Sequence, residues 1–313
     1  CKKAQEKYLS YGITTVQEGM FAKGLIQIYK KILSNNTLKI DLISYMDFKE
    51  KEEIKNAFPQ NIKKYYKNMK FLGYKIFLDG SPQLRTAWMK TPYNVIQENE
   101  EKYYGINTMS DKEVREAVNQ AKNDNMQILA HCNGDKAAEQ YINAIKNIDL
   151  KNERSVMIHA QLLDTDQLED VKKCHIIPSF FVAHTYYWGD THIKNFGIKR
   201  ASKISPLKSA INKNIIFTLH QDSPVIEPNM FETIWCAVNR KTKSNVILGK
   251  KEQISVLDAV KAVTINAAYQ YFEEDKKGSI KEGKIANLII VDKNPLKIEK
   301  DKIREIKILE TIK

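Results

Sequence analysis

Seven short apolar runs, each followed by a longer amphipathic stretch, constrain the fold of this chain more than any other feature. They are rich in β-branched and aromatic residues, and they lie at residues 12–19, 39–48, 73–80, 126–134, 154–161, 175–184 and 214–224. The stretches between them have helical periodicity, and one of them opens with Ser110 and Glu113, the signature of a capping box. Strands that alternate with helices form parallel sheets, so the pattern predicts an α/β fold made of repeated βα units.

The number of βα units and the chain length indicate one barrel with a small additional region. A chain of 313 residues suits a single (β/α)8 TIM-type barrel with a small appendage. A closed barrel needs eight strands, and this chain supplies seven. Residues 1–16, "CKKAQEKYLSYGITTV", are typical of a helix that leads into a strand, so they begin in the middle of a repeat. We therefore expect barrel strands two to eight here, with the first βα unit upstream of Cys1 and missing from this chain.

The character of the sequence changes after residue 250. The helical stretch "SVLDAVKAVTINAAYQYF" is followed by "KKGSIKEGKIANLIIVDKNPLKI" and "IREIKILETIK", which alternate and turn like antiparallel strands. The segment "KKGSIKEGK" is expected to be a hairpin of this region. The sequence thus predicts a barrel over residues 1–272 and, over 273–313, the C-terminal part of a small β-sandwich.

Charge and cysteine usage limit the partners of the chain. The net charge is +12, but the lysines are spread over helix-like stretches and do not form an arginine-rich stripe, so we expect no nucleic-acid partner. No apolar run approaches the roughly 18 residues of a membrane span, so we expect no membrane partner. The four cysteines are far apart and form no CxxC pair. This spacing favours a reducing compartment and a cytoplasmic location, although a signal upstream of Cys1 would lie outside this sequence.

Histidines and acids gather at the carboxyl ends of the predicted strands, where a barrel of this kind builds its active site. Five of the six histidines lie at or just beyond a strand end, and two acids and a lysine accompany them: Lys75, Asp79, His131, His159, His184, His192, His220 and Asp222. This concentration favours a ligand role for His131 and His159 over a role in the core. Neutral imidazole and carboxylate groups together suit Zn²⁺ or a similar first-row ion. We expect a divalent metal site with one or two ions.

Asp222 and Lys75 each admit more than one role. Asp222 is expected to bind the metal and to carry a proton from the attacking water to the leaving nitrogen; the alternative is a cap on the helix that follows it. Lys75 lies within an apolar run, where lost solvation lowers the pKa of its amine. A neutral amine can form a Schiff base, or take up CO₂ and become a carbamate that bridges two metals. The alternative is a lysine that reaches from the strand end to solvent.

Several blocks together resemble the YtcJ-like branch of the metal-dependent amidohydrolases, in order and over nearly the whole chain. They are "KIFLDGSPQLRTAWMKTPY", "ILAHCNGDKAAEQYINAI", "RSVMIHAQLL", "HTYYWGD", "LHQDSPV", "AVNR" and "KGSIKEGKIANLIIVDKNP". The resemblance implies a (β/α)8 barrel with a small β-sandwich, and hydrolysis of a carbon–nitrogen bond, usually an amide. It also implies that His131 and His159 are metal ligands, that Asp222 is the acid of the last strand, and that Lys75 is the candidate for a carboxylated lysine.

The chain departs from the family pattern in an informative way. The family has a His-x-His pair on its first barrel strand, and no HxH occurs in this sequence. This agrees with the count of seven strands. Ile158 stands where much of the family has Glu, and Cys132-Asn133 replaces the commoner Ala-Ile; both are expected to be branch variation. If these 313 residues were the whole molecule, we would expect weak or no metal binding and poor activity.

The remaining residues suggest how a substrate is held. Arg85 is expected to bind a substrate carboxylate or else to pair with Asp79, and His184 and Trp188 to form one wall of the pocket. His220 is expected to bind substrate or to stabilise a developing oxyanion. The substrate is then a small amide-type molecule, and a homodimer is one option for the assembly. The competing interpretations are a metal-poor, non-catalytic barrel with a binding or regulatory role and, through Lys75, a Schiff-base lyase.

Overall fold

The computed structural model describes residues 1–94 and 101–313, and it confirms an α/β fold. Seven strands form one parallel sheet in which every strand pairs with its neighbours in the chain. The strands are β1 (Thr15–Phe21), β2 (Asp41–Asp47), β3 (Met69–Phe77), β4 (Gln127–Cys132), β5 (Val156–His159), β6 (Ile177–Phe180) and β7 (Thr218–Leu219). Each overlaps one of the seven predicted runs.

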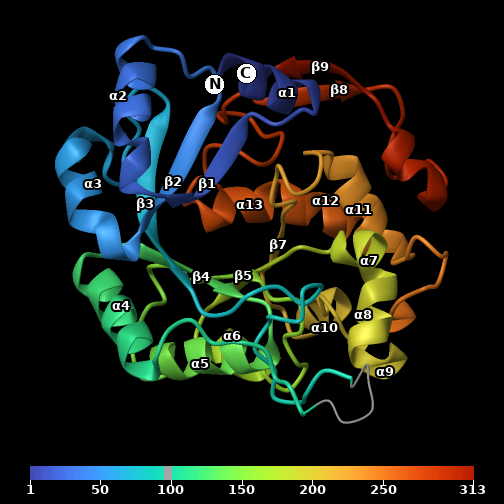
Figure 1. Ribbon diagram of the computed structural model, residues 1–313. Helices are drawn as coiled ribbons and strands as arrows, with labels where there is room; N and C mark the ends of the chain where they lie inside the picture. The colour runs from blue at the N-terminus through green and yellow to red at the C-terminus, as the bar shows by residue number, and fades with distance from the viewer. Residues whose placement is uncertain (95–100) are drawn as a thin grey trace.

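Helices lie outside the curled sheet (Figure 1). They are α1 (Lys2–Ser10), α2 (Ile26–Ser34), α3 (Lys51–Ala57), α4 (Asp111–Asn123), α5 (Asp135–Ile145), α6 (Leu168–Lys173), α7 (His184–Tyr187), α8 (Gly189–Phe196), α9 (Ile198–Ala201), α10 (Leu207–Asn212), α11 (Met230–Asn239), α12 (Val256–Val263) and α13 (Ile265–Gln270). The capping box that the sequence predicts is formed at α4, where Ser110 and Glu113 each bind the backbone N–H of the other. No helix of the described residues is both long and apolar enough to span a membrane.

The two faces of the sheet carry different cores, because side chains alternate along each strand. The outer face packs against the helices in one large cluster that includes Ile128, Ala130 and Met157. The inner face carries a smaller cluster of Ile43, Tyr45, Leu72, Leu129, Val156, Ile158 and Ile177. Ile158, which stands where the resemblance expects Glu, is therefore part of the inner core.

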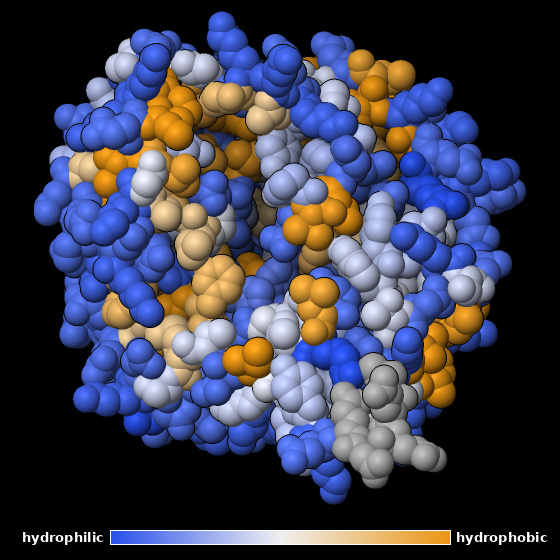
Figure 2. Space-filling view, viewed as in Figure 1, coloured by the Kyte–Doolittle hydropathy of each residue, from blue (hydrophilic) through white to orange (hydrophobic). Residues whose placement is uncertain are grey.

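The sheet is curled but not closed within the described residues. Its order runs from β1 to β7, and these two edge strands do not pair with each other. The molecule is hollowed near the centre of the face seen in Figure 2, in the region that Figure 1 shows between β1 and β7. The observed architecture is thus a half-barrel of seven parallel strands.

The C-terminal region is simpler than the sequence predicts. Strands β8 (Leu288–Val291) and β9 (Ile308–Ile312) form a two-stranded antiparallel sheet that lies against α1. Residues 276–284 contain no strand, so the predicted hairpin is wrong. The segment forms a set of turns instead of paired strands. A hydrogen bond from the Ile285 N–H to the Lys276 carbonyl joins its two ends. The division at residue 272 and the sandwich stay predictions.

The segment after α13 covers the amino ends of the strands. Lys70, near the start of β3, makes a buried ion pair of 2.7 Å with Glu273. Arg154, which precedes β5, pairs with Glu274 at 2.7 Å and stacks on the Tyr269 ring. The amino end of the half-barrel is therefore filled by the chain itself, and its carboxyl end is left for a site.

Candidate functional site

Three histidines form a continuous line at the carboxyl ends of β4, β5 and β7. The His131 Nδ1 atom lies 3.1 Å from His159 Nε2, and His159 Nδ1 lies 3.1 Å from His220 Nε2. The line ends on the Ser179 hydroxyl, 2.9 Å from His220 Nδ1. The structure thus brings together three of the histidines that the sequence places at strand ends.

Local backbone geometry aims these side chains into the mouth of the half-barrel. His131 follows Leu129 by two positions on β4, so it shares the inward direction of that residue. Simple alternation would send His159 outward like Met157, but His159 has a φ of 74° and Ala160 a φ of 47°. Two successive left-handed residues without glycine are costly, and such strain persists mainly where function requires it. The strain turns His159 into line with the other two rings.

The hydrogen bonds of the line can all point in one direction. His131 Nε2 lies 3.0 Å from the Gly80 carbonyl, an acceptor, and 3.0 Å from the Asn133 amide nitrogen, a donor, and a proton on Nε2 satisfies the carbonyl. His131 Nδ1 is then an acceptor for the His159 Nε2–H, and His159 Nδ1 accepts from the His220 Nε2–H. His220 Nδ1 in turn accepts from the Ser179 hydroxyl. Every ring in the line is satisfied as a neutral imidazole.

Burial keeps these rings uncharged. Loss of solvation, with the nearby Lys75 charge, lowers the pKa of His131 to about 3 and that of His220 to about 3. Burial and the neighbouring histidines hold the pKa of His159 well below its usual value. Neutral imidazole is the form that binds metal ions, so the three rings are ready to act as ligands at neutral pH.

Lys75 lies near the line, where its charge acts on all three histidines, and it interacts electrostatically with Asp222. Lys75 is 5% exposed, so the alternative of a lysine that reaches to solvent is wrong. Its burial lowers the pKa of its amine to about 8, and the charge of Asp222 opposes that shift. Burial raises the pKa of the Asp222 carboxyl. The helix after β7 is capped by the Asn229 side chain, so the capping alternative for Asp222 is also wrong.

Aromatic residues extend the site beyond the histidine line. The Phe181 ring lies 5.3 Å from His220 and 4.7 Å from His184, and the His184 ring lies 4.5 Å from Trp188. The Phe181 ring therefore lies between His220 and His184, so His184 and Trp188 are placed where they can form a wall of the pocket. Arg85 lies farther out, in the loop after β3, where it donates to the Asn94 carbonyl and stacks over Tyr93.

Comparison with known sequences identifies the family to which this arrangement belongs. The sequence model of the Amidohydrolase family matches residues 1–313. The chain belongs to the amidohydrolase family. YtcJ of Bacillus subtilis, named as an amidohydrolase, is 28% identical over 251 residues, which are 78% of this chain and 46% of that protein. The N-substituted formamide deformylase of Arthrobacter pascens is 24% identical over 241 residues, 76% of this chain and 43% of that protein.

A solved structure agrees with the fold. A metal-dependent hydrolase from Pyrococcus horikoshii superposes with a TM-score of 0.81 at 22% identity, covering 96% of this chain and 60% of that one. This likeness confirms the architecture of the half-barrel. The chain spans about half the length of the relatives named above.

The donors of this amidohydrolase fit a divalent metal in chemistry, but they form only part of a site. Two imidazole nitrogens on one tetrahedral zinc lie about 3.3 Å apart, close to the 3.1 Å between His131 Nδ1 and His159 Nε2. Among residues 1–94 and 101–313, however, no three or more His, Cys, Asp or Glu side chains are grouped to hold one ion. The histidine pair fits a metal, and a complete ligand set requires more groups.

Sequence reasoning missed two residues that organise the site. The sequence places Asp79 at a strand end and offers it as a partner for Arg85, but it does not indicate that its carboxylate accepts three backbone N–H groups, from Trp88, Asn133 and Gly134. Ser179 was not considered, although it ends the histidine line. Ser179 lies two residues after the inward-facing Ile177 in β6, and this spacing is the sequence feature that could have identified it.

The buried histidines predict that acid destabilises the fold. Burial lowers the pKa of His192 to about 3, whereas an unfolded histidine titrates near 6.5. Between these values the unfolded chain binds more protons, so the free energy of unfolding falls as pH falls, by about 1.4 kcal/mol per pH unit for each such histidine. Asp79 offsets the effect of one such histidine on the pH dependence. Burial raises the pKa of its carboxyl to about 7, so below that pH the native state binds a proton that the unfolded chain does not.

Urea unfolding between pH 7 and pH 4, with chelator present, measures this slope. His192→Gln is expected to reduce it by about 1.4 kcal/mol per pH unit, since it removes one buried group that the native state leaves unprotonated. Replacing the exposed His175 in the same way is the control and is expected to have a much smaller effect. Equal slopes in wild type and His192→Gln would contradict the prediction.

Proposed function

We propose that this protein is a metal-dependent hydrolase that cleaves a carbon–nitrogen bond of amide type, other than a peptide bond. The observation that carries the proposal is the line of neutral imidazoles at the carboxyl ends of β4, β5 and β7, with Lys75 and Asp222 beside it. Reacting groups of parallel barrels come from these strand ends. The likeness to an N-substituted formamide deformylase supports N-substituted formamides as the first substrates to test.

The metal in this proposal is a divalent ion, with zinc as the first choice. His131, His159 and Asp222 would hold it, together with Lys75 where its amine is carboxylated. Such an ion, when bound, would lower the pKa of a water ligand to about 7 and would polarise a carbonyl. We propose that the remaining ligands come from a first barrel strand outside these 313 residues, which would lie between β7 and β1. The greater length of the relatives supports this.

The proposed chemistry assigns a task to each side chain. Asp222 accepts a proton from the attacking water at a carboxylate oxygen and delivers it to the leaving nitrogen. His220, which stays neutral, binds the substrate or, where its Nε2–H turns from His159 to the substrate, donates that N–H to the developing oxyanion. His184 and Trp188 form a wall for the substrate, and Arg85 pairs with a substrate carboxylate where one is present.

A second candidate function is a metal-poor, non-catalytic barrel with a binding or regulatory role. It is favoured by the absence of a group of three or more metal-binding side chains in the part of the chain that the structure describes. Metal content separates it from the hydrolase.

Elemental analysis of purified protein tests the proposal, both on these 313 residues and on the protein with the upstream residues of its gene. We expect one to two zinc equivalents in the longer protein and weak binding by the shorter chain. His131→Ala is expected to abolish binding, since it removes one of the paired nitrogens. His175→Ala, a change at an exposed histidine, is the control and is expected to retain the metal. A longer protein that holds no metal and hydrolyses no N-substituted formamide would establish the non-catalytic alternative.

Carbon-13 spectroscopy tests the state of Lys75. A pKa of about 8 leaves part of the amine neutral near pH 7, and the neutral amine adds CO₂ to give a carbamate and one released proton. Labelled bicarbonate is expected to produce a carbamate carbon signal in the wild type and none in Lys75→Met. If borohydride instead traps a covalent adduct of substrate with Lys75, the Schiff-base lyase replaces the hydrolase.

A further inference from the structure

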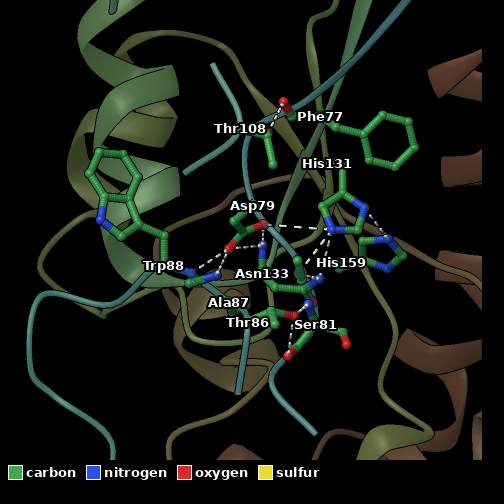
Figure 3. Close-up of polar contacts among 12 residues, drawn as sticks. Phe77, Asp79, Ser81, Thr86, Ala87, Trp88, Thr108, His131, Asn133 and His159 are labelled. Atoms are coloured by element: carbon green, nitrogen blue, oxygen red, sulfur yellow. Dashed lines mark hydrogen bonds and ion pairs between the residues drawn. The ribbon is translucent and has the colours of Figure 1, made fainter. Parts of the chain in front are cut away.

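Asp79 lies where three segments at the mouth of the half-barrel meet, and its carboxylate is 3% exposed (Figure 3). It accepts from the Trp88 N–H at 3.0 Å, from Asn133 N–H at 2.9 Å and from Gly134 N–H at 2.7 Å. Trp88 belongs to the loop after β3, and Asn133 and Gly134 join β4 to α5. One buried carboxylate therefore ties this loop to the strand end that carries His131.

The same carboxylate lies beside the His131 ring. Asp79 Oδ1 is 3.6 Å from His131 Nε2, and the carbonyl of the next residue, Gly80, is 3.0 Å from the same nitrogen. The Asn133 amide nitrogen donates to the Gly80 carbonyl at 2.8 Å, which fixes that carbonyl in place. The Asp79 carboxylate and the Gly80 carbonyl both favour a proton on His131 Nε2, whereas the Asn133 amide nitrogen, a donor 3.0 Å from the same atom, favours a lone pair there.

We propose that Asp79 is a positioning residue that holds His131 in one tautomer and one orientation, with Nε2 protonated and the Nδ1 lone pair directed to the side of His159. A carboxylate on the far nitrogen of a ligating histidine is a general device for orienting the ring and raising its basicity. The value of this orientation for metal binding rests on the proposed function. The tautomer itself does not, because it follows from contacts within the chain.

Asp135 provides a matched comparison for this role. Asp135 is the first residue of α5. Like Asp79, it holds the loop after β3, because its carboxylate accepts the Lys90 N–H at 2.8 Å. Burial raises the pKa of its carboxyl, as it does for Asp79. The Asp135 carboxylate binds the Lys90 N–H and not His131. A purely structural role would make the two aspartates equivalent, whereas a positioning role concerns Asp79 alone.

Nitrogen-15 spectroscopy of the histidine rings tests the inference on the purified 313-residue chain. The protein has six histidines, so the ring spectrum is countable, and His131→Gln identifies the signals of His131. We expect Nε2 protonated and Nδ1 unprotonated in the wild type and in Asp135→Asn. In Asp79→Asn the same signals are expected to shift toward a mixture of both tautomers. Titration with Zn²⁺ alone is expected to give about 10- to 100-fold weaker binding for Asp79→Asn than for Asp135→Asn.

A second variant keeps the test decisive if Asp79→Asn does not fold. Asn133→Ala keeps the backbone N–H that binds Asp79 and removes only the amide beside the ring. The wild-type tautomer is expected to persist in it, and its loss would assign the positioning to Asn133 and overturn the inference. An unchanged tautomer in folded Asp79→Asn would also overturn it. If the wild-type 313-residue chain binds no Zn²⁺, the tautomer result alone decides the role of Asp79.

Discussion

Asp222→Asn is expected to hydrolyse amide substrates about 10²- to 10⁴-fold more slowly than the wild type, which is the usual contribution of a positioned proton carrier. The amide of asparagine fills nearly the same space but cannot take a proton from water at neutral pH. Burial raises the pKa of the Asp222 carboxyl while the Lys75 charge lowers it. The pH dependence of kcat/KM should therefore show an acidic limb that Asp222→Asn lacks. The measurement is steady-state hydrolysis of an N-substituted formamide by the metal-loaded protein.

Two controls make this result specific to proton transfer. Asp190→Asn changes a half-buried aspartate that accepts an exposed hydrogen bond from the Ser244 hydroxyl, and it is expected to keep wild-type kcat. Elemental analysis of the same Asp222→Asn preparation shows whether metal is retained. Retained metal with wild-type kcat would remove Asp222 from the proton pathway, and lost metal would assign it chiefly to metal binding.

The architecture was predictable because it depends on local pattern. Seven runs of β-branched and aromatic residues, separated by helical periodicity, admit few arrangements other than consecutive parallel strands. The capping box at Ser110 was predictable for the same reason, since its partners are three residues apart. The hairpin at 276–284 was wrong because alternation of lysine and glycine suits a set of turns equally well. There the Lys284 ammonium binds the Ser279 hydroxyl within the segment itself.

The site was predictable as a set of residues and not as an arrangement. The sequence places His131, His159 and His220 at strand ends, and the carboxyl ends of parallel strands lie at the same edge of a sheet, so these three residues could be predicted as site residues. The line of hydrogen bonds depends on the left-handed φ of His159, which the strand-like pattern of the sequence does not indicate. The role of Asp79 depends on backbone N–H groups up to 55 residues away. Contacts of that range are settled by tertiary packing, so sequence pattern does not contain them.

The environment of Arg240 predicts the largest loss of stability from one substitution in the described residues. The side chain is completely buried and donates to three backbone carbonyls, those of Leu248 at 2.7 Å, Ser205 at 3.0 Å and Ile204 at 2.5 Å. Burial lowers the pKa of its guanidinium to about 10, so it remains charged at neutral pH. Arg240 thereby joins the end of α11 to the two chain segments that contain these carbonyls.

Arg240→Met is expected to lower the free energy of unfolding by about 3–5 kcal/mol, because it leaves the buried carbonyls of Ile204 and Leu248 without a donor and removes one of the two donors of the Ser205 carbonyl. Arg240→Lys is expected to recover only part of this, since one ammonium does not reproduce the planar fork of donors. Arg200 is a matched control: it also donates to three carbonyls, of Phe196, Thr91 and Pro92, but it is partly exposed. Arg200→Met is expected to cost about 1 kcal/mol, because water replaces the lost donors. Equal losses in urea unfolding of Arg240→Met and Arg200→Met would show that burial of the guanidinium does not set its contribution.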